Sequence, residues 1–183
     1  MKKIAVFFAE GYEEIEALTV VDICRRCGLE VNMVSVNGDK LVKGSHGVGV
    51  EMDTVLSQVN FGECDMLVLP GGMPGTKNLE ASEELMRQVD AFHAAGKYIA
   101  AICAAPSIFG HRGILKGRKA CSYPGFESHL EGADVTNGPV EISDHVITSR
   151  GLGTAVDFAL AIVKVFCGQE KAEELAKSVV YVG

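Results

Sequence analysis

Two kinds of hydrophobic pattern alternate along the first part of the chain: short apolar runs, and longer stretches with helical spacing. Lys3–Phe8 is an apolar run that predicts a buried strand. In Glu13–Arg26 the apolar side chains recur every three or four positions, which predicts an amphipathic helix that Gly28 ends. Glu30–Val36 predicts a second strand. This order of elements is a β-α-β unit, in which the two strands run parallel.

The same alternation continues toward the C-terminus. Asp65–Leu69 and Tyr98–Ile102 predict two further strands, and the second is apolar throughout, which favours a central place in a sheet. A helix is expected over Asn78–Ala95. Two more helices are expected near the end of the chain, one containing Phe158 to Phe166 and one over Glu170–Ser178.

The remaining segments carry weaker patterns. The glycine-dotted stretch Leu41–Val50 predicts a hairpin or an irregular excursion, and Pro106 is expected to open a short helix. Two short strands are expected within the loop-rich stretch Lys119–Ser149. Together the elements predict an α/β protein with a mostly parallel, doubly wound sheet, helices on both faces, and a single domain over residues 1–183.

Composition and charge narrow the class of protein. Of the 183 residues, 48% are hydrophobic and 22% charged, which is typical of a globular chain. The net charge of −7 argues against nucleic acid as a partner. No stretch is long enough to span a membrane, and the first apolar run ends at Glu10, short of the about 7–15 apolar residues of a secretory signal. We therefore expect a cytoplasmic protein without a membrane partner.

The cysteines and histidines do not indicate a metal site. Cys24 and Cys27 form a C-x-x-C, but at the end of a predicted helix, whereas the redox-active kind opens one. We interpret both as core residues, and no disulfide framework is expected in a domain of this size. The five histidines show no ligand spacing, and Gly151-Leu152-Gly153 is too short for a dinucleotide fingerprint. No metal ion and no cofactor are expected.

Three loops that follow predicted strands carry the candidate chemistry. They are Glu10–Glu16, Pro70–Gly75 and Ala100–Pro106. In doubly wound sheets, ligands bind at the carboxyl ends of the strands, so these loops should converge on one site.

Cys103 is the strongest candidate for a reactive group. It stands between a buried strand and a helix opened by Pro106, where small neighbours such as Ala104 and Ala105 permit a nucleophile elbow. The positive end of a helix and unpaired amides would favour its thiolate form. The alternative is a structural cysteine on a central strand, and spacing alone leaves the two interpretations level.

Two further features support Cys103. The amides of Gly71 and Gly72 could form an oxyanion pocket with that of Ala104, although an ordinary tight turn is the commoner explanation for two such glycines. Glu16 could face the thiol in its protonated form and shuttle a proton. For Glu16 the simpler interpretation is a solvated first-turn carboxylate, like Glu13 and its neighbour Glu14, and spacing alone favours that interpretation.

These motifs, with the segment Thr148–Ala155, resemble the ThiJ/PfpI superfamily over essentially the whole chain. The resemblance is strongest to the branch of the human parkinsonism-linked protein deglycase and its bacterial relatives. It implies a flavodoxin-like three-layer sandwich of the kind found in class I glutamine amidotransferases, and a homodimer without a cofactor. It also implies that Cys103 is the nucleophile in a strained elbow, Glu16 the protonated pocket glutamate, and Gly71 and Gly72 the paired pocket glycines.

Other positions match that branch less closely. Arg26 aligns with an arginine that contacts anions, and His46 stands where an arginine reaches across the dimer. Tyr123 replaces a histidine that precedes a proline near the cysteine in several relatives, and tyrosine is a poor base at neutral pH. Ala104 occupies the position of the histidine that the protease branch requires, so proteolysis is not expected.

Three functional hypotheses follow. The first is a cofactor-independent cysteine enzyme of the glyoxalase III or protein deglycase type, acting on a small aldehyde such as methylglyoxal or on a glycated substrate. The second is an oxidative-stress sensor or chaperone that signals through oxidation of Cys103 without turnover. The third, an amidase or glutamine amidotransferase relative, requires a histidine near the thiol, and the sequence offers no good candidate.

Overall fold

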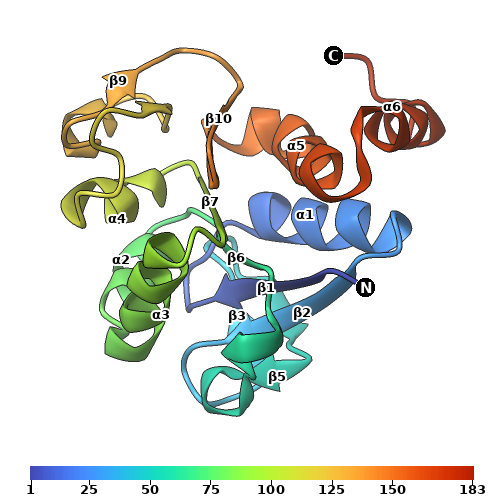
Figure 1. The fold of residues 1–183 in the computed structure, drawn as a ribbon. Coiled ribbons are helices and arrows are strands. Elements are labelled where there is room, and N and C mark those ends of the chain that lie inside the picture. The colour runs from blue at the N-terminus through green and yellow to red at the C-terminus, as the bar shows by residue number, and fades with distance from the viewer.

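A seven-stranded sheet forms the centre of the computed structural model, which describes all residues from 1 to 183 (Figure 1). In spatial order the strands are β10 (Val140–Ser143), β11 (Val146–Ser149), β7 (Tyr98–Ile102), β6 (Met66–Leu69), β1 (Lys3–Phe8), β2 (Glu30–Ser35) and β5 (Thr54–Val55). Neighbouring strands run parallel except β10 and β11, which pair antiparallel. The sheet is therefore mostly parallel.

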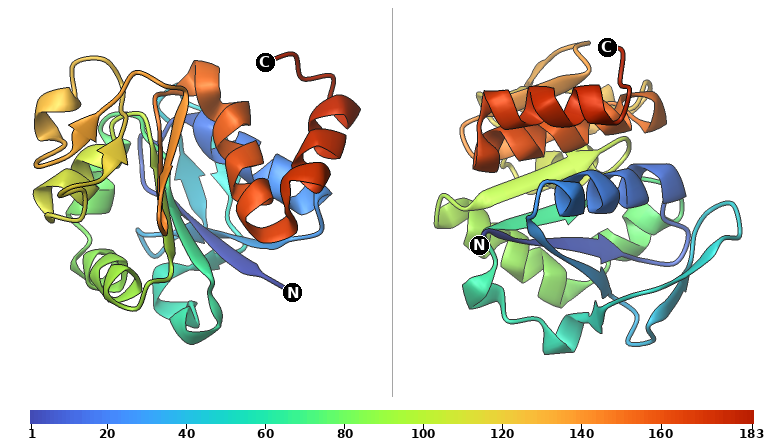
Figure 2. Two further views of the ribbon diagram at one scale, coloured as in Figure 1. Left: turned by 45° about the horizontal axis from the view of Figure 1, so that its top comes forward. Right: turned by 90° about the vertical axis from the view of Figure 1, so that its right-hand side faces the viewer.

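Helices cover both faces of this sheet (Figure 2). One face carries α1 (Glu14–Arg26) and α5 (Ala155–Cys167), with α6 (Gln169–Ser178) packed against α5. The other face carries α2 (Gly75–Glu80), α3 (Glu83–Ala94) and α4 (Pro106–His111). The result is a three-layer α/β sandwich, which confirms the predicted fold class.

Strand β1 shows why both faces must be covered. Its side chains alternate, so that Ile4, Val6 and Phe8 enter the hydrophobic cluster beneath α1 and α5. Ala5 and Phe7 enter the cluster beneath α3 and α4. From Ile4 to Phe8 the strand is apolar and buried at every position, so it has no solvent-facing side, and this accounts for the continuous apolar run in the sequence.

Several short elements lie outside the main sheet. The glycine-dotted segment forms an antiparallel hairpin of β3 (Leu41–Lys43) and β4 (Gly49–Glu51), one of the two alternatives expected for it. Strands β8 (Lys119–Ala120) and β9 (Asp134–Val135) form a separate parallel pair. Four short 3-10 helices complete the chain: η1 (Leu56–Gln58), η2 (Phe61–Glu63), η3 (Glu127–His129) and η4 (Leu152–Thr154).

Two sequence-based predictions of local structure are wrong. The helix predicted over Asn78–Ala95 is two helices, because the Ser82 hydroxyl accepts a hydrogen bond from the amide of Leu85 and starts α3 anew. Leu79 and Leu85 are both buried in the same cluster, so the apolar periodicity hides the break. The stretch Lys119–Ser149 holds four short strands, β8 to β11, and not two.

The fold brings three loops together at one edge of the sheet. Strands β1, β6 and β7 are adjacent and parallel, and the loops that follow them lead into α1, α2 and α4. This edge is where the sequence predicts a site. None of the helices combines the length and the apolar character needed to cross a lipid bilayer.

Candidate active site

Cys103 occupies the sharp turn between β7 and α4. Its φ of 67° lies in the left-handed region, which a residue with a side chain seldom adopts. The amide of Cys103 donates to the carbonyl of Ser149 at 3.0 Å, and its carbonyl accepts from the amide of Tyr123 at 2.8 Å. These two bonds hold the backbone of Cys103 in a strained turn. Such a turn is the nucleophile elbow that the small neighbouring residues predict.

Gly71 lies directly against the reactive pair. A Cβ atom at this position would lie 2.5 Å from the Cβ of Cys103 and 2.7 Å from Oε2 of Glu16, so only glycine fits. The Gly71 amide donates to the same Oε2 atom at 2.9 Å. It therefore positions Glu16 and is not free for an oxyanion, contrary to the prediction that it would join the amides of Gly72 and Ala104.

The other two predicted amides do face the sulfur. The N–H groups of Gly72 and Ala104 are directed at the thiol of Cys103, where they favour a negative charge. Gly72 adopts a φ of +87° and packs against the backbone of Tyr12 and Glu13. Two amides thus converge beside the sulfur, in the arrangement needed to stabilise an oxyanion formed on a substrate.

Glu16 faces the thiol and not the solvent. Only 1% of its surface is exposed, and its carboxyl group forms a hydrogen bond with Cys103. Burial raises the pKa of Glu16 to about 7, against the opposing effect of its hydrogen bonds to Cys103 and Gly71. The simpler interpretation, a solvated first-turn carboxylate, is therefore wrong for this residue.

The pKa of Cys103 is shifted in the direction opposite to the prediction of a favoured thiolate. Burial, followed by the charge and the hydrogen bond of Glu16, raises the pKa of Cys103 to about 12. The amides of Gly72 and Ala104 lower this pKa but do not outweigh those effects. Between pH values of about 7 and 12 the pair therefore carries one negative charge and one proton, shared between sulfur and carboxylate.

A cavity of about 370 Å³ opens onto this pair. It brings together six of the predicted site residues: Cys103, Glu16, Gly72, Ala104, Tyr123 and His46. The cavity has four further lining residues that were not predicted: Glu13, Met73, Phe126 and Leu152. Of these, only Phe126 lies outside the motif segments identified in the sequence. Met73, with 42% of its surface exposed, forms part of the wall.

The structure does not bring Arg26 to this cavity. Arg26 lies in the last turn of α1, about 15 Å along the helix axis from Glu16 in the first turn. Its Nε atom bonds Oδ2 of Asp22 at 2.7 Å. The same side chain lines a separate groove on the outer side of α1.

Glu14 fixes the hairpin that forms one edge of the site. Its buried carboxylate accepts hydrogen bonds from the amide of His46 at 2.8 Å and from Ser45 Oγ at 3.3 Å, and it lies 3.0 Å from His46 Nδ1. Burial acts to raise the pKa of Glu14, but the bonds from His46 and the backbone outweigh it and lower the pKa to about 2. The expectation of a solvated Glu14 is wrong, because its carboxylate is buried against the hairpin formed by the glycine-dotted segment Leu41–Val50.

One group of side chains near the cavity has potential ligand atoms that are close enough together to bind a metal ion. Glu13, Glu14 and His46 each place a potential ligand atom within 4.8 Å of the others. The oxygens of Glu14 already accept the hairpin hydrogen bonds described above, so the group has a structural task without a metal. The six cysteines are all free thiols.

Comparisons with known proteins place these features in context. The sequence pattern of the DJ-1/PfpI family matches residues 2–165. The chain is 35% identical over 169 residues to glutathione-independent glyoxalase DJR-1.2 of Caenorhabditis elegans, covering 92% of this chain and 90% of that protein. The solved structure of oxidized DJ-1 from Toxoplasma gondii superposes with a TM-score of 0.95 at 36% identity, covering 100% of both chains.

A plant relative is much longer. Protein DJ-1 homolog B of Arabidopsis thaliana is 37% identical over 177 residues, which cover 96% of this chain but 40% of the plant protein. The chain thus spans less than half the length of that relative.

The raised pKa of Glu16 predicts a pH-dependent effect on stability. In the unfolded chain this carboxyl group ionises near its ordinary pKa of 4.5, but in the folded protein it does so only near 7. Stability is therefore lost as the pH rises between these values, by about 3 kcal/mol in total. Relative to Glu16→Gln, the free energy of unfolding of the wild type should fall by that amount between pH 4 and pH 8 in urea titrations.

The control is Glu83→Gln, which removes an exposed carboxylate from the first turn of α3. Its difference from the wild type should stay flat over the same pH range. A flat difference for Glu16→Gln as well would show that the Glu16 carboxyl group is not buried against Cys103.

Proposed function

Because the chain belongs to the DJ-1/PfpI family, we propose that it is a cofactor-independent cysteine enzyme that acts on reactive aldehydes, in the manner of a glyoxalase III or protein deglycase. The observation that carries this proposal is the buried hydrogen bond between Glu16 and Cys103 at the floor of an open cavity. The name of the C. elegans relative, a glutathione-independent glyoxalase, supports the same chemistry.

The first step joins the substrate to the protein. Cys103 Sγ attacks the aldehyde carbon of a 2-oxoaldehyde, and the electrons of the C=O bond move to oxygen as the C–S bond forms. The Glu16 carboxylate accepts the thiol proton and returns it to that oxygen, giving a hemithioacetal. The amides of Gly72 and Ala104 lie beside the sulfur and stabilise the oxyanion before it is protonated.

The second step moves a proton within the bound substrate. Glu16 takes the proton from the former aldehyde carbon and delivers it to the adjacent carbonyl carbon by way of an enediol. The hydroxyl proton moves from the first oxygen to the second in the same rearrangement, which leaves a thioester of a 2-hydroxy acid. Water then cleaves the C–S bond, restores the thiol and releases the acid, so methylglyoxal and water give lactate. Tyr123 stands where some relatives carry a histidine, and Glu16 is the group in contact with the thiol that can move these protons.

This mechanism predicts a pH profile for turnover. Glu16 must be a carboxylate to accept the thiol proton, so kcat/KM for methylglyoxal should rise with pH through about 7 and then level off. Glu16→Gln should lose that rise and reduce kcat/KM by about 10² to 10⁴. Cys103→Ser should abolish lactate formation, whereas Cys167→Ser, a half-buried cysteine outside the cavity, should retain it. Lactate formation by Cys103→Ser at the wild-type rate would rule out the proposed nucleophile.

A second candidate function is a redox sensor, which the description of the T. gondii structure as oxidized favours. Two molecules of hydrogen peroxide would convert the Cys103 thiol to a sulfinic acid and release two waters. The amides of Gly72 and Ala104 are placed to donate hydrogen bonds to the new oxygens.

Peptide mapping by mass spectrometry after mild peroxide treatment separates the two functions. A sensor requires two oxygen atoms at Cys103, ahead of the other five cysteines, together with a newly gained activity such as suppression of aggregation. For an enzyme alone, oxidation at Cys103 should track the loss of lactate formation and bring no gain.

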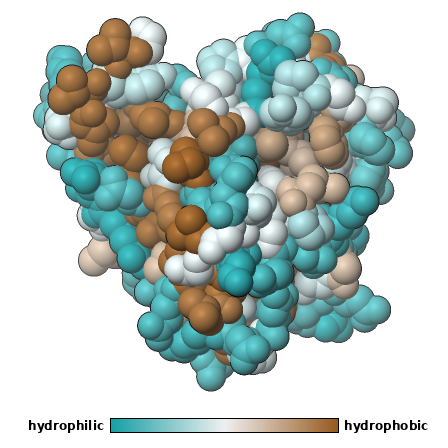
Figure 3. Space-filling view, turned by 180° about the vertical axis from the view of Figure 1, so that it is seen from behind, coloured by the Kyte–Doolittle hydropathy of each residue, from teal (hydrophilic) through white to brown (hydrophobic).

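We also propose that the chain forms a homodimer through the outer side of α1 and the C-terminal segment. Apolar side chains gather at the surface around the C-terminus (Figure 3), where 83% of Val180 and 89% of Val182 are exposed. A groove of about 790 Å³ continues from there along Ile15 and Leu18 of α1. Exposed apolar patches of this kind mark association surfaces.

The dimer can be tested by light scattering on a sizing column. The wild type should have the mass of two chains, and the double variant I15D/V180D should have the mass of one, because two buried charges would oppose association. Val135→Asp, at an apolar residue that is 41% exposed in β9, should remain dimeric. A wild type with the mass of one chain would refute the dimer.

A further inference from the structure

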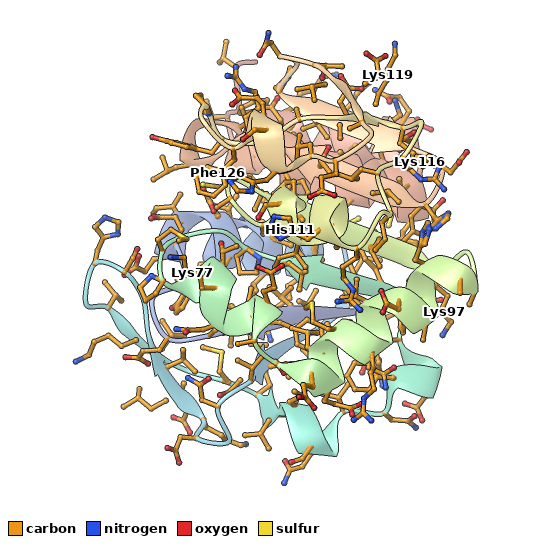
Figure 4. The ribbon with its side chains drawn as sticks, turned by 90° about the vertical axis from the view of Figure 1, so that its left-hand side faces the viewer. Lys77, Lys97, His111, Lys116, Lys119 and Phe126 are labelled. Atoms are coloured by element: carbon orange, nitrogen blue, oxygen red, sulfur yellow. The ribbon has the colours of Figure 1, made fainter.

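A second cavity, of about 360 Å³, lies next to the one that contains Cys103. Met73 and Phe126 line both cavities, so a ligand bound at Cys103 can extend past these two side chains. We call this second space the side cavity. Figure 4 shows Lys77, His111 and Phe126 close together at its rim. Its remaining lining residues are Thr76, Glu80, Ser107 and His129.

Thr76 lies in the wall of the side cavity and has a buried hydroxyl group without a partner. Only 3% of its surface is exposed, and its hydroxyl group has no hydrogen-bond partner in the protein. Tyr12 has the one other buried side-chain oxygen or nitrogen without a partner, and it lines neither cavity. A buried hydroxyl without a partner is destabilising, and a ligand in the side cavity would supply the missing bond.

A chain of hydrogen bonds forms the opposite wall. Oε1 of Glu80 lies 2.7 Å from Nδ1 of His111, and Nε2 of His111 lies 3.1 Å from Nδ1 of His129. When Glu80 accepts from His111 and His111 accepts from His129, Nε2 of His129 is left as a free acceptor. The Ser107 hydroxyl donates to the carbonyl of Ala104 at 2.7 Å, so its lone pairs also remain available.

The side cavity therefore offers donors and acceptors together. Lys77 and Thr76 can donate, whereas Glu80, Ser107 and His129 can accept. Hydroxyl groups both donate and accept, so a polyhydroxyl chain satisfies this set. A phosphate or carboxylate fits less well, because Glu80 adds a negative charge beside the single lysine. The half-buried ring of Phe126 gives an apolar surface for the C–H groups of such a chain.

We propose that the side cavity binds the polyhydroxyl tail of a sugar-derived 2-oxoaldehyde whose aldehyde carbon lies at Cys103. This inference rests on the proposed function and narrows its substrate class. It makes Thr76 and Lys77 specificity residues, which contact the tail and take no part in the proton transfers. Methylglyoxal, whose tail is a methyl group, does not reach them.

The kinetic test compares two 2-oxoaldehydes, methylglyoxal and 3-deoxyglucosone, in the full-length protein. In Thr76→Val and in Lys77→Met the ratio of kcat/KM for 3-deoxyglucosone to that for methylglyoxal should fall about tenfold, as expected for one lost hydrogen bond. Lys116→Met removes a lysine on the same side of the molecule but outside the side cavity, and should keep the wild-type ratio (Figure 4). An unchanged ratio in both test variants would overturn the inference.

A binding test separates this inference from the proposed function. In Cys103→Ser, the non-reactive polyol D-arabinitol should shift the imidazole NMR signals of His111 and His129, and the added substitution Thr76→Val should weaken the shift about tenfold. Arabinitol binding by Cys103→Ser, together with a wild type that turns over neither aldehyde, would refute the enzyme but support a polyol site. Turnover of both aldehydes without arabinitol binding, or shifts caused by inorganic phosphate in its place, would refute the polyol site alone.

Discussion

A single proton held between the Glu16 carboxyl group and the Cys103 thiol is the interaction on which the rest of this site depends. A carboxylate and a thiolate in direct contact at a buried site would repel each other strongly. One of the two groups therefore keeps the proton at neutral pH. The protein supports this arrangement from both sides. Gly71 donates to the carboxylate, and the amides of Gly72 and Ala104 face the sulfur. The negative charge can lie on the sulfur or on the carboxylate. This suits a thiol that has to lose its proton to react and regain it afterwards.

The sheet topology is what makes this pair possible. Glu16, Gly71 and Cys103 follow β1, β6 and β7, which are far apart in the chain but adjacent and parallel in the sheet. The carboxyl ends of parallel strands lie at the same edge of the sheet, so the segments that follow these three strands are close together. The absence of a side chain at Gly71 then allows the other two loops to approach within contact distance.

The sequence carried enough information for the fold and for the loops that meet around Cys103, but not for the rim of the cavity or for the pKa of the thiol. Apolar runs such as Tyr98–Ile102 identified the strands, because a fully buried strand has a pattern that few other elements share. The break at Ser82 was hidden because Leu79 and Leu85 keep the apolar period across it. The role of Glu14 depends on a hairpin about thirty residues away, a long-range contact that spacing along one helix does not reveal. The pKa of Cys103 depends on burial and on Glu16 together, and the sequence showed only the favourable amides.

The left-handed backbone conformation of Cys103 is unfavourable for folding, and the same residue carries the candidate reactive thiol. A glycine there would adopt the same turn without steric cost, and it would remove a sulfur that is buried against a carboxylate. Evolution under pressure for stability alone would therefore replace the cysteine. The cysteine therefore occupies a conformation that lowers the stability of the fold, and strain of this kind is found most often at functional sites.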